Sequence, residues 1–170
     1  AGQLVYVFAN VENVPLVRAI VREAYLAGAR YVHTFFGDRH HRRAQIEHGA
    51  EDSLGFSPPQ LVGWIESMRE ERPAVISLHG DAEPELFGDL DPALVARSRP
   101  KEIEAAYIPL VTGRKANWTI VAAPNEGWAQ YLFGEPDVER LWQAVATAVR
   151  LDAPDPVAAW REHAKKLKER

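Results

Sequence analysis

Hydrophobic and polar positions follow two patterns along this chain: short continuous apolar runs, and longer segments with apolar residues every three or four positions. The short runs are rich in β-branched and aromatic residues, and they predict buried strands near residues 4–9, 30–36, 74–79 and 118–122. Strands that alternate with helices predict crossover connections. We therefore expect an α/β fold, a small doubly wound and mostly parallel sheet of four strands in the order 2-1-3-4 with flanking helices.

Proline, glycine and capping residues mark the expected helices. The first helix has Pro15 in its first turn and Gly28 after its end. Ser57 followed by Pro58 predicts a helix start with a hydroxyl cap, and Asp38 is expected to cap a short helix. Further helices are expected over 84–87 and 92–96, from Pro100 to near Thr112, over 125–133, and from Pro136 and Asp155 onward.

The domain organisation follows from these elements. We expect residues 1–150 to form a Rossmann-like α/β domain and residues 151–170 to form a C-terminal helix that starts a connection to a missing domain. The chain has no Met at position 1, and its last helix runs into the basic segment 165–170 without a cap. Both features favour a domain cut from a longer chain, and they leave open why it was isolated or whether it was engineered.

Composition and charge exclude several functional classes. Lys and Arg number 20 against 24 Asp and Glu, a formal net charge of -4, which argues against a general nucleic-acid binder. The absence of Cys excludes disulfides, thiol catalysis and Cys-ligated metal sites. No apolar run approaches the length of a membrane span, so we expect no membrane association, and a cytoplasmic location fits the composition.

Polar residues follow the expected strands, where open α/β sheets bind their ligands. The alternative for each is a turn or a helix cap, which is the more common role of Asn and Asp at such positions. The sequence has no glycine-rich phosphate motif and no nucleophile elbow, so the catalytic residues stay unassigned. The cleft hypothesis names six ligand-binding candidates: Asn10, Asp38, His79, Asp81, Asn125 and Trp128.

A histidine-rich segment raises the question of a metal site. His40 and His41 lie among three arginines, and His48 follows two helical turns after His41. Positive charge from the arginines disfavours a divalent cation, so we expect no metal here. A solvated basic segment or a subunit contact is the preferred interpretation.

The last helix carries an apolar stripe. Val157, Trp160, Ala164 and Leu167 recur at helical spacing. We expect Trp160 and Leu167 to form an interface, because a domain cut from its neighbour exposes the surface that the neighbour covered. The alternative is that this stripe folds onto the sheet and is buried.

Five segments resemble, in family order, the thermophilic metallo-aminopeptidases that include aminopeptidases T and S. They span most of residues 3–164 and read VPLVRAIVREAYLAGARYV, EDSLGFSPPQLVGWIE, ERPAVISLHGDAEPELFGDLDP, NWTIVAAPNEGWA and FGEPDVERLWQAVATAVRLDAPDPVAAWREH. The resemblance implies a dimeric, two-domain enzyme that removes N-terminal amino acids from peptides with two divalent metal ions, zinc or cobalt. Its metal ligands lie in the C-terminal domain, so none is carried over to this chain.

Three functions follow as hypotheses. The first is the N-terminal, non-metal-binding domain of such an aminopeptidase, without cofactor and catalytically silent alone, whose partners are the missing C-terminal catalytic domain and a second copy of itself. The peptide substrate would be bound only by the full-length enzyme. The second is an engineered or repurposed small domain that binds a ligand, or catalyses a reaction, at the strand carboxyl ends. The third is a self-associating scaffold.

Overall fold

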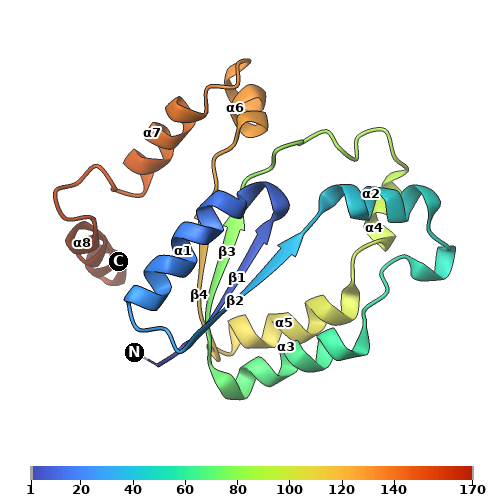
Figure 1. The fold of residues 1–170 in the computed structure, drawn as a ribbon, viewed down its shortest axis with the longest axis horizontal. Helices are drawn as coiled ribbons and strands as arrows, with labels where there is room; N and C mark the ends of the chain where they lie inside the picture. Colours follow the sequence, from blue (N-terminus) through green and yellow to red (C-terminus); the bar gives the residue numbers. More distant parts are fainter. Residues whose placement is uncertain (1, 170) are drawn as a thin grey trace. The chain divides into compact units, whose positions relative to one another are not determined.

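The computed structural model describes residues 2–169 and contains a parallel four-stranded sheet in the order β2-β1-β3-β4 (Figure 1). The strands are β1 (Leu4–Asn10), β2 (Tyr31–Gly37), β3 (Ala74–His79) and β4 (Asn117–Ala122). The expected α/β fold, the strand positions and the strand order are confirmed. Right-handed crossovers explain the order, because the chain passes over one face from β1 to β2 and over the other from β2 to β3 and from β3 to β4.

One face of the sheet packs against α1 (Val14–Leu26). Val5, Val7 and Val32 from the strands meet Val17 of the helix, and all are buried. The helix begins at a short 3-10 turn, η1 (Val11–Asn13), and Gly28 follows its end with a φ of 88°, a left-handed conformation that favours glycine. The sequence-predicted start and end of this helix are confirmed.

The opposite face packs against α3 (Pro59–Glu71) and α5 (Lys101–Thr112). Tyr6 of β1 lies against Ile65 and Met68 of α3 and Leu110 of α5, all of them buried. Pro109 lies inside α5 and the helix ends at Thr112, as the sequence predicts. Three smaller elements complete this part of the chain: α2 (Arg39–His48), η2 (Glu51–Ser53) and α4 (Pro92–Arg97).

The structure divides into two compact units. Unit 1 runs to His79 and resumes from Glu83 to Ala123, so it contains the sheet with α1 to α5. Unit 2 comprises Gly80–Ala82 and the chain from Pro124 onward, with α6 (Glu126–Phe133), α7 (Val138–Ala148) and α8 (Pro156–Lys168). The domain boundary expected at residue 150 stays a prediction.

Two local predictions are wrong. Residues 84–89 form turns instead of a short helix, because side chains from α2 bind this segment, as described below. Ser57 does not cap α3, which starts at Pro59 after Pro58. Its hydroxyl oxygen is buried with no hydrogen-bond partner in the described structure. Pro58 and Pro59 set the helical start, and Pro59 lacks the N–H that a hydroxyl at Ser57 would accept from at the second helical position.

Candidate functional site

At the carboxyl end of β1, the side chain of Asn13 binds the backbone of Asn10. The Asn10 N–H donates to Oδ1 of Asn13 at 3.0 Å, and Asn13 is 5% exposed. Gly37 pairs with Asn10 across the sheet, and a Cβ at Gly37 would lie 3.4 Å from the Asn10 Oδ1. Asn10 is thus half-buried beside Gly37 and Asn13 at the end of β1, where open α/β sheets bind ligands.

Asp38 and His79 follow the next two strands of unit 1. The Asp38 carboxylate accepts the backbone N–H groups of His40 at 2.8 Å and His41 at 3.4 Å, so it caps α2. His79 ends β3 with an exposed side chain. The capping role of Asp38 that its position predicts is confirmed.

The other three candidates belong to unit 2. Asn125 caps α6, because its Oδ1 accepts the backbone N–H of Trp128 at 2.8 Å. Asp81 and Trp128 are half-buried. Since the six candidates are divided between the two units, a shared cleft that contains all of them stays a prediction.

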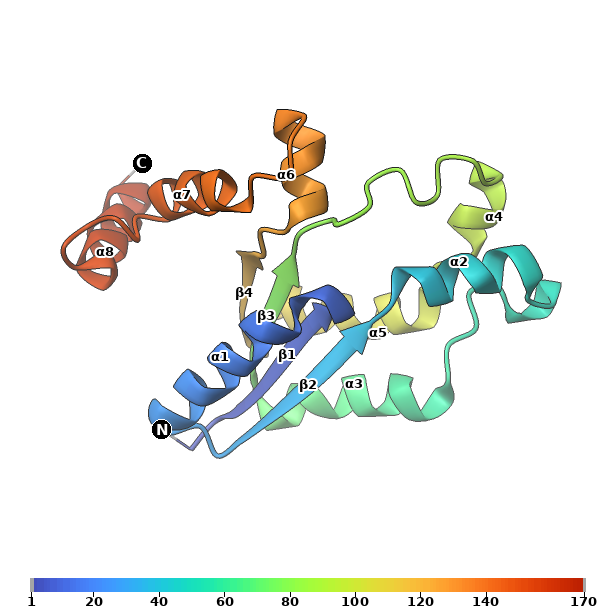
Figure 2. The same cartoon turned by 45° about the horizontal axis from the view of Figure 1, so that its top comes forward.

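The basic helix α2 holds the segment between β3 and α5, an arrangement that we call the α2 clamp: Arg39, His40, Arg42 and Arg43 with residues 83–98. Arg43 forms two charge-assisted hydrogen bonds to Asp89, at 2.7 and 2.6 Å, and donates to the Leu86 carbonyl. Both ribbon views show α2 beside α4 (Figures 1 and 2).

Further arginine contacts extend the α2 clamp. Arg42 donates to Ser98 Oγ at 2.9 Å and to the Val95 carbonyl at 2.8 Å. The guanidinium carbons of Arg39 and Arg42 lie 5.0 and 5.1 Å from the ring centroid of Phe87. The basic segment thus organises an intramolecular contact, and the sequence-based alternative of a subunit contact stays a prediction.

Electrostatics in the α2 clamp follow from its ion pairs. His40 Nε2 lies 2.7 Å from Glu83 Oε1, and the hydrogen bond and negative charge of Glu83 raise the pKa of His40 above its usual value. The Arg43 hydrogen bond lowers the pKa of Asp89, and burial lowers the pKa of Arg42. Arg43 pairs also with Glu47 at 2.8 Å. These charges neutralise one another locally.

The histidines of α2 do not gather around a cation site. His48 lies 3.7 Å from Glu47, and His40 pairs with Glu83. Across residues 2–169, no group of three or more His, Asp or Glu side chains is placed to hold a metal ion. The donor set of the described chain does not fit a dinuclear metal centre, so we assign no catalytic step through a metal to these residues.

An aromatic cluster covers the α3 face of β1 and β2, and sequence reasoning missed it. His33 and Phe35 stack with ring centroids 4.2 Å apart, and Phe35 lies 4.4 Å from Trp64 of α3. Tyr6 and Phe8 complete the cluster from β1. The sequence does carry a signal for this cluster: in both strands the aromatic side chains are two positions apart, and this spacing puts them on one face of the sheet.

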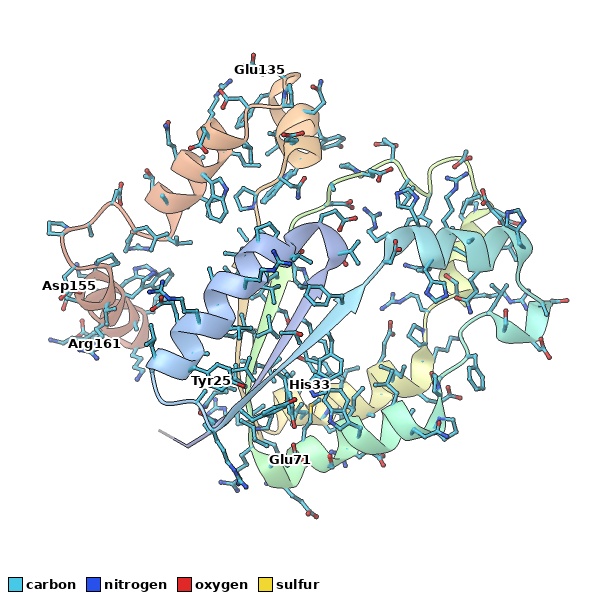
Figure 3. The ribbon with its side chains drawn as sticks, viewed as in Figure 1. Tyr25, His33, Glu71, Glu135, Asp155 and Arg161 are labelled. Carbon is cyan, nitrogen blue, oxygen red and sulfur yellow. The ribbon has the colours of Figure 1, made fainter. Side chains whose placement is uncertain are left out.

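Tyr6 is the most perturbed phenol of this cluster. Its hydroxyl donates to Glu71 Oε2 at 2.6 Å, and its side chain is 5% exposed. Burial, with the hydrogen bond and charge of Glu71 added, raises the pKa of Tyr6 to about 12. Figure 3 shows Glu71 and His33 on the same side of the sheet. The hydroxyl is therefore a buried donor, committed to a structural hydrogen bond.

In unit 2, α8 leaves its apolar stripe exposed. Val157 is 59%, Trp160 43% and Leu167 57% exposed. The Trp160 indole N–H donates to the Val149 carbonyl at 2.7 Å, and Arg150 lies 5.0 Å from its ring centroid. These contacts orient one edge of the ring, and the interface role of Trp160 and Leu167 stays a prediction.

Comparison with known protein families identifies the family of this chain. Residues 1–170 match the family described as thermophilic metalloprotease (M29). The chain belongs to this family. Among M29 relatives, Aminopeptidase T of Thermus thermophilus is 34% identical over 176 residues, and Aminopeptidase 2 of Geobacillus stearothermophilus is 31% identical over 172 residues. The resemblance predicted from sequence is confirmed.

The matched part of the M29 relatives is limited. The alignments cover 99% and 98% of this chain but 43% and 41% of those two relatives. The structure of wild-type AmpT from Thermus thermophilus aligns with a TM-score of 0.85 at 28% identity, over 97% of this chain and 41% of that chain. The chain corresponds to the N-terminal part of M29 proteins. No helix among residues 2–169 has both the length and the apolar character that a membrane crossing requires.

Proposed function

We propose that this chain is the N-terminal domain of a dinuclear-metal aminopeptidase, and that it is catalytically silent alone. The carrying observation is the family match over residues 1–170 together with relatives named aminopeptidases, of which the chain spans about two fifths. In this proposal the C-terminal remainder supplies the zinc or cobalt ligands and the peptide substrate is bound only by the full-length enzyme. We further propose that the sheet and its helices form a Rossmann-like domain, and that the protein is a cytoplasmic homodimer.

The chemistry of the side chains supports the division of labour. A dinuclear hydrolase holds its metal ions about 3.5–4 Å apart between several carboxylates and imidazoles. In the described chain, His40 pairs with Glu83, Arg43 pairs with Asp89, and Arg39 donates to the Glu83 backbone carbonyl. Asp38 and Asn125 are engaged as helix caps. These residues serve the scaffold, and the proposal leaves the hydrolytic chemistry to the remainder.

The test is hydrolysis of aminoacyl chromogenic substrates by the isolated chain with added zinc or cobalt. We expect no release of product above a mock purification. A fusion of residues 1–170 with the C-terminal remainder of Thermus thermophilus aminopeptidase T is the positive arm, and we expect metal-dependent activity from it. Release by the isolated chain that a chelator abolishes would overturn the proposed silence.

The two alternative functions use different surfaces of the chain. A small-molecule function would place the ligand at the strand carboxyl ends, where unit 1 carries Asn10, Asp38 and His79. A self-associating scaffold is favoured by the exposed stripe of α8, where Trp160 is 43% and Leu167 57% exposed. Chemical-shift mapping tests the first, and light scattering tests the second.

A further inference from the structure

The outer edge of β4 is a free strand edge in unit 1. The order β2-β1-β3-β4 places β3 on one side of β4 and, among the described residues, no strand on the other. Asn117 N–H donates to the Pro73 carbonyl at 3.1 Å, and Ala123 N–H donates to the His79 carbonyl at 2.7 Å. Because amide direction alternates along a strand, the N–H groups of residues 118, 120 and 122 point to the free edge.

The side chains of β4 are apolar on the α3 and α5 face of the sheet and mixed on the α1 face. Trp118 and Ile120 share the α3 and α5 face and are 51% and 58% exposed. On the α1 face, Val121 is 36% exposed and follows the polar side chains of Asn117 and Thr119. Edge strands are usually protected by charged residues, Pro or bulges. The β4 sequence, NWTIVA, contains no charge and no Pro.

The other edge of the sheet differs. The outward N–H of Val32 on β2 donates to the Tyr25 hydroxyl at 3.2 Å, so a side chain of α1 covers part of that edge (Figure 3). A hydroxyl at this position occupies a donor that another strand would need. The two edges of one sheet are thus built differently, and β4 lacks the charged or Pro residues that usually protect an edge strand.

We propose that the free edge of β4 binds an extended apolar segment from the C-terminal remainder of the full-length chain, running parallel to β4 as the next strand of the sheet. Relatives extend well beyond the matched region, since this chain spans 41% to 43% of them. Helices α6, α7 and α8 follow β4, and a helical crossover after a parallel strand leads to another parallel strand. The inference rests on the proposed function, which assigns a C-terminal partner to this chain.

Amide hydrogen exchange measured by NMR tests the pairing. The isolated chain is compared with the fusion to the C-terminal remainder of Thermus thermophilus aminopeptidase T. We expect the outward amides of Trp118, Ile120 and Ala122 to exchange at least ~100-fold more slowly in the fusion, because an added strand accepts their hydrogen bonds. The inward amides of Thr119 and Val121 already pair with β3 and serve as internal controls.

A proline variant separates strand pairing from general burial. Ile120→Pro removes an outward donor and leaves the ladder with β3 intact, since Pro is tolerated where its missing N–H faces outward. In the fusion, Ile120→Pro should return the amides of Trp118 and Ala122 to fast exchange. Phe36→Pro removes an outward donor from β2 and is the matched control, which should leave β4 protected.

Three outcomes would overturn the proposal. Outward amides that exchange equally fast in the isolated chain and the fusion would show that no strand is added. If the outward amides are protected in the isolated chain at every dilution, the β4 edge is covered by unit 2 of the same chain. If that protection is lost on dilution, the edge is covered by a second copy of the chain. Activity of the fusion is scored separately, so an inactive fusion with a protected β4 edge would contradict the proposed function and support the strand.

Discussion

At the scale of single residues, the buried phenol of Tyr6 makes the stability of the fold depend on pH. Tyr6 donates a 2.6 Å hydrogen bond to Glu71 from a position that is 5% exposed. Deprotonation would place a phenolate beside a carboxylate in a site with little water, which is the physical cause of its raised pKa. The protonated phenol is therefore part of the folded structure.

We expect the free energy of unfolding to fall between about pH 10 and pH 12 through Tyr6. Its pKa is raised to about 12 in the folded state, so the contribution is complete below pH 10 and is lost as the pH rises through 12. A shift of this size corresponds to about 2–3 kcal/mol. Urea titrations at stepped pH should show this loss in the parent chain and not in Tyr6→Phe. An equal pH dependence in both would contradict the assignment.

Two glycines in helices test local packing in opposite directions. A Cβ at Gly127 in α6 would collide with the Ala82 carbonyl oxygen, while a Cβ at Gly63 in α3 meets nothing within 4 Å. We expect Gly127→Ala to destabilise unit 2 by about 1–3 kcal/mol through overpacking. Gly63→Ala should stabilise by about 0.5–1 kcal/mol through helix propensity. Thermal unfolding measures both, and stabilisation by Gly127→Ala would refute the collision.

At the scale of elements, the local sequence predicts the strands and their order, whereas contacts between distant segments are not encoded in any local pattern. The strands and their order follow from β-branched runs and from crossover handedness, as Leu4–Asn10 and Ala74–His79 show. The α2 clamp could not be predicted from the sequence, because Arg43 and Asp89 are 46 positions apart and no local pattern pairs them. For the same reason a helix was predicted over 84–87, where long-range contacts hold turns instead.

The α2 clamp should respond to pH through His40. Glu83 raises the pKa of His40, so the stabilising contribution is complete below the unfolded value near 6.5 and is lost as the pH rises through the folded pKa. The difference in free energy of unfolding between the parent chain and His40→Gln should therefore be largest at acid pH and shrink as the pH rises through the folded pKa. His41→Gln, an exposed neighbour on the same helix, is the control. A difference that stays constant across this range would refute the role of His40.

At the scale of the whole molecule, the β4 edge of unit 1 and the α8 stripe of unit 2 are candidate partner surfaces, and they are physically different. The β4 edge offers backbone donors flanked by the exposed apolar side chains of Trp118 and Ile120, so it suits an extended strand. The α8 stripe offers side chains alone, so it suits another helix or an apolar patch. Variants at the two surfaces should therefore have independent effects, because each surface lies in a different unit.

We expect the isolated chain to self-associate through the stripe of α8. A contiguous exposed apolar patch favours association, and Val157, Trp160 and Leu167 are each more than two fifths exposed. Trp160→Ala should yield a more monomeric and still folded chain in size-exclusion chromatography with light scattering. Because the ring is already 43% exposed, its loss should cost less than the ~3–5 kcal/mol typical of a buried aromatic side chain.

The matched control is Tyr131→Ala in α6, which removes an aromatic ring that is 62% exposed in the same unit but outside the stripe. Tyr131→Ala should leave the oligomeric state unchanged, and Leu167→Ala should weaken association in the same direction as Trp160→Ala. A parent chain that stays monomeric at high concentration would refute the interface. Unfolding of Trp160→Ala would instead place the ring in a core, because an interface anchor can be removed without loss of the fold whereas a core residue cannot.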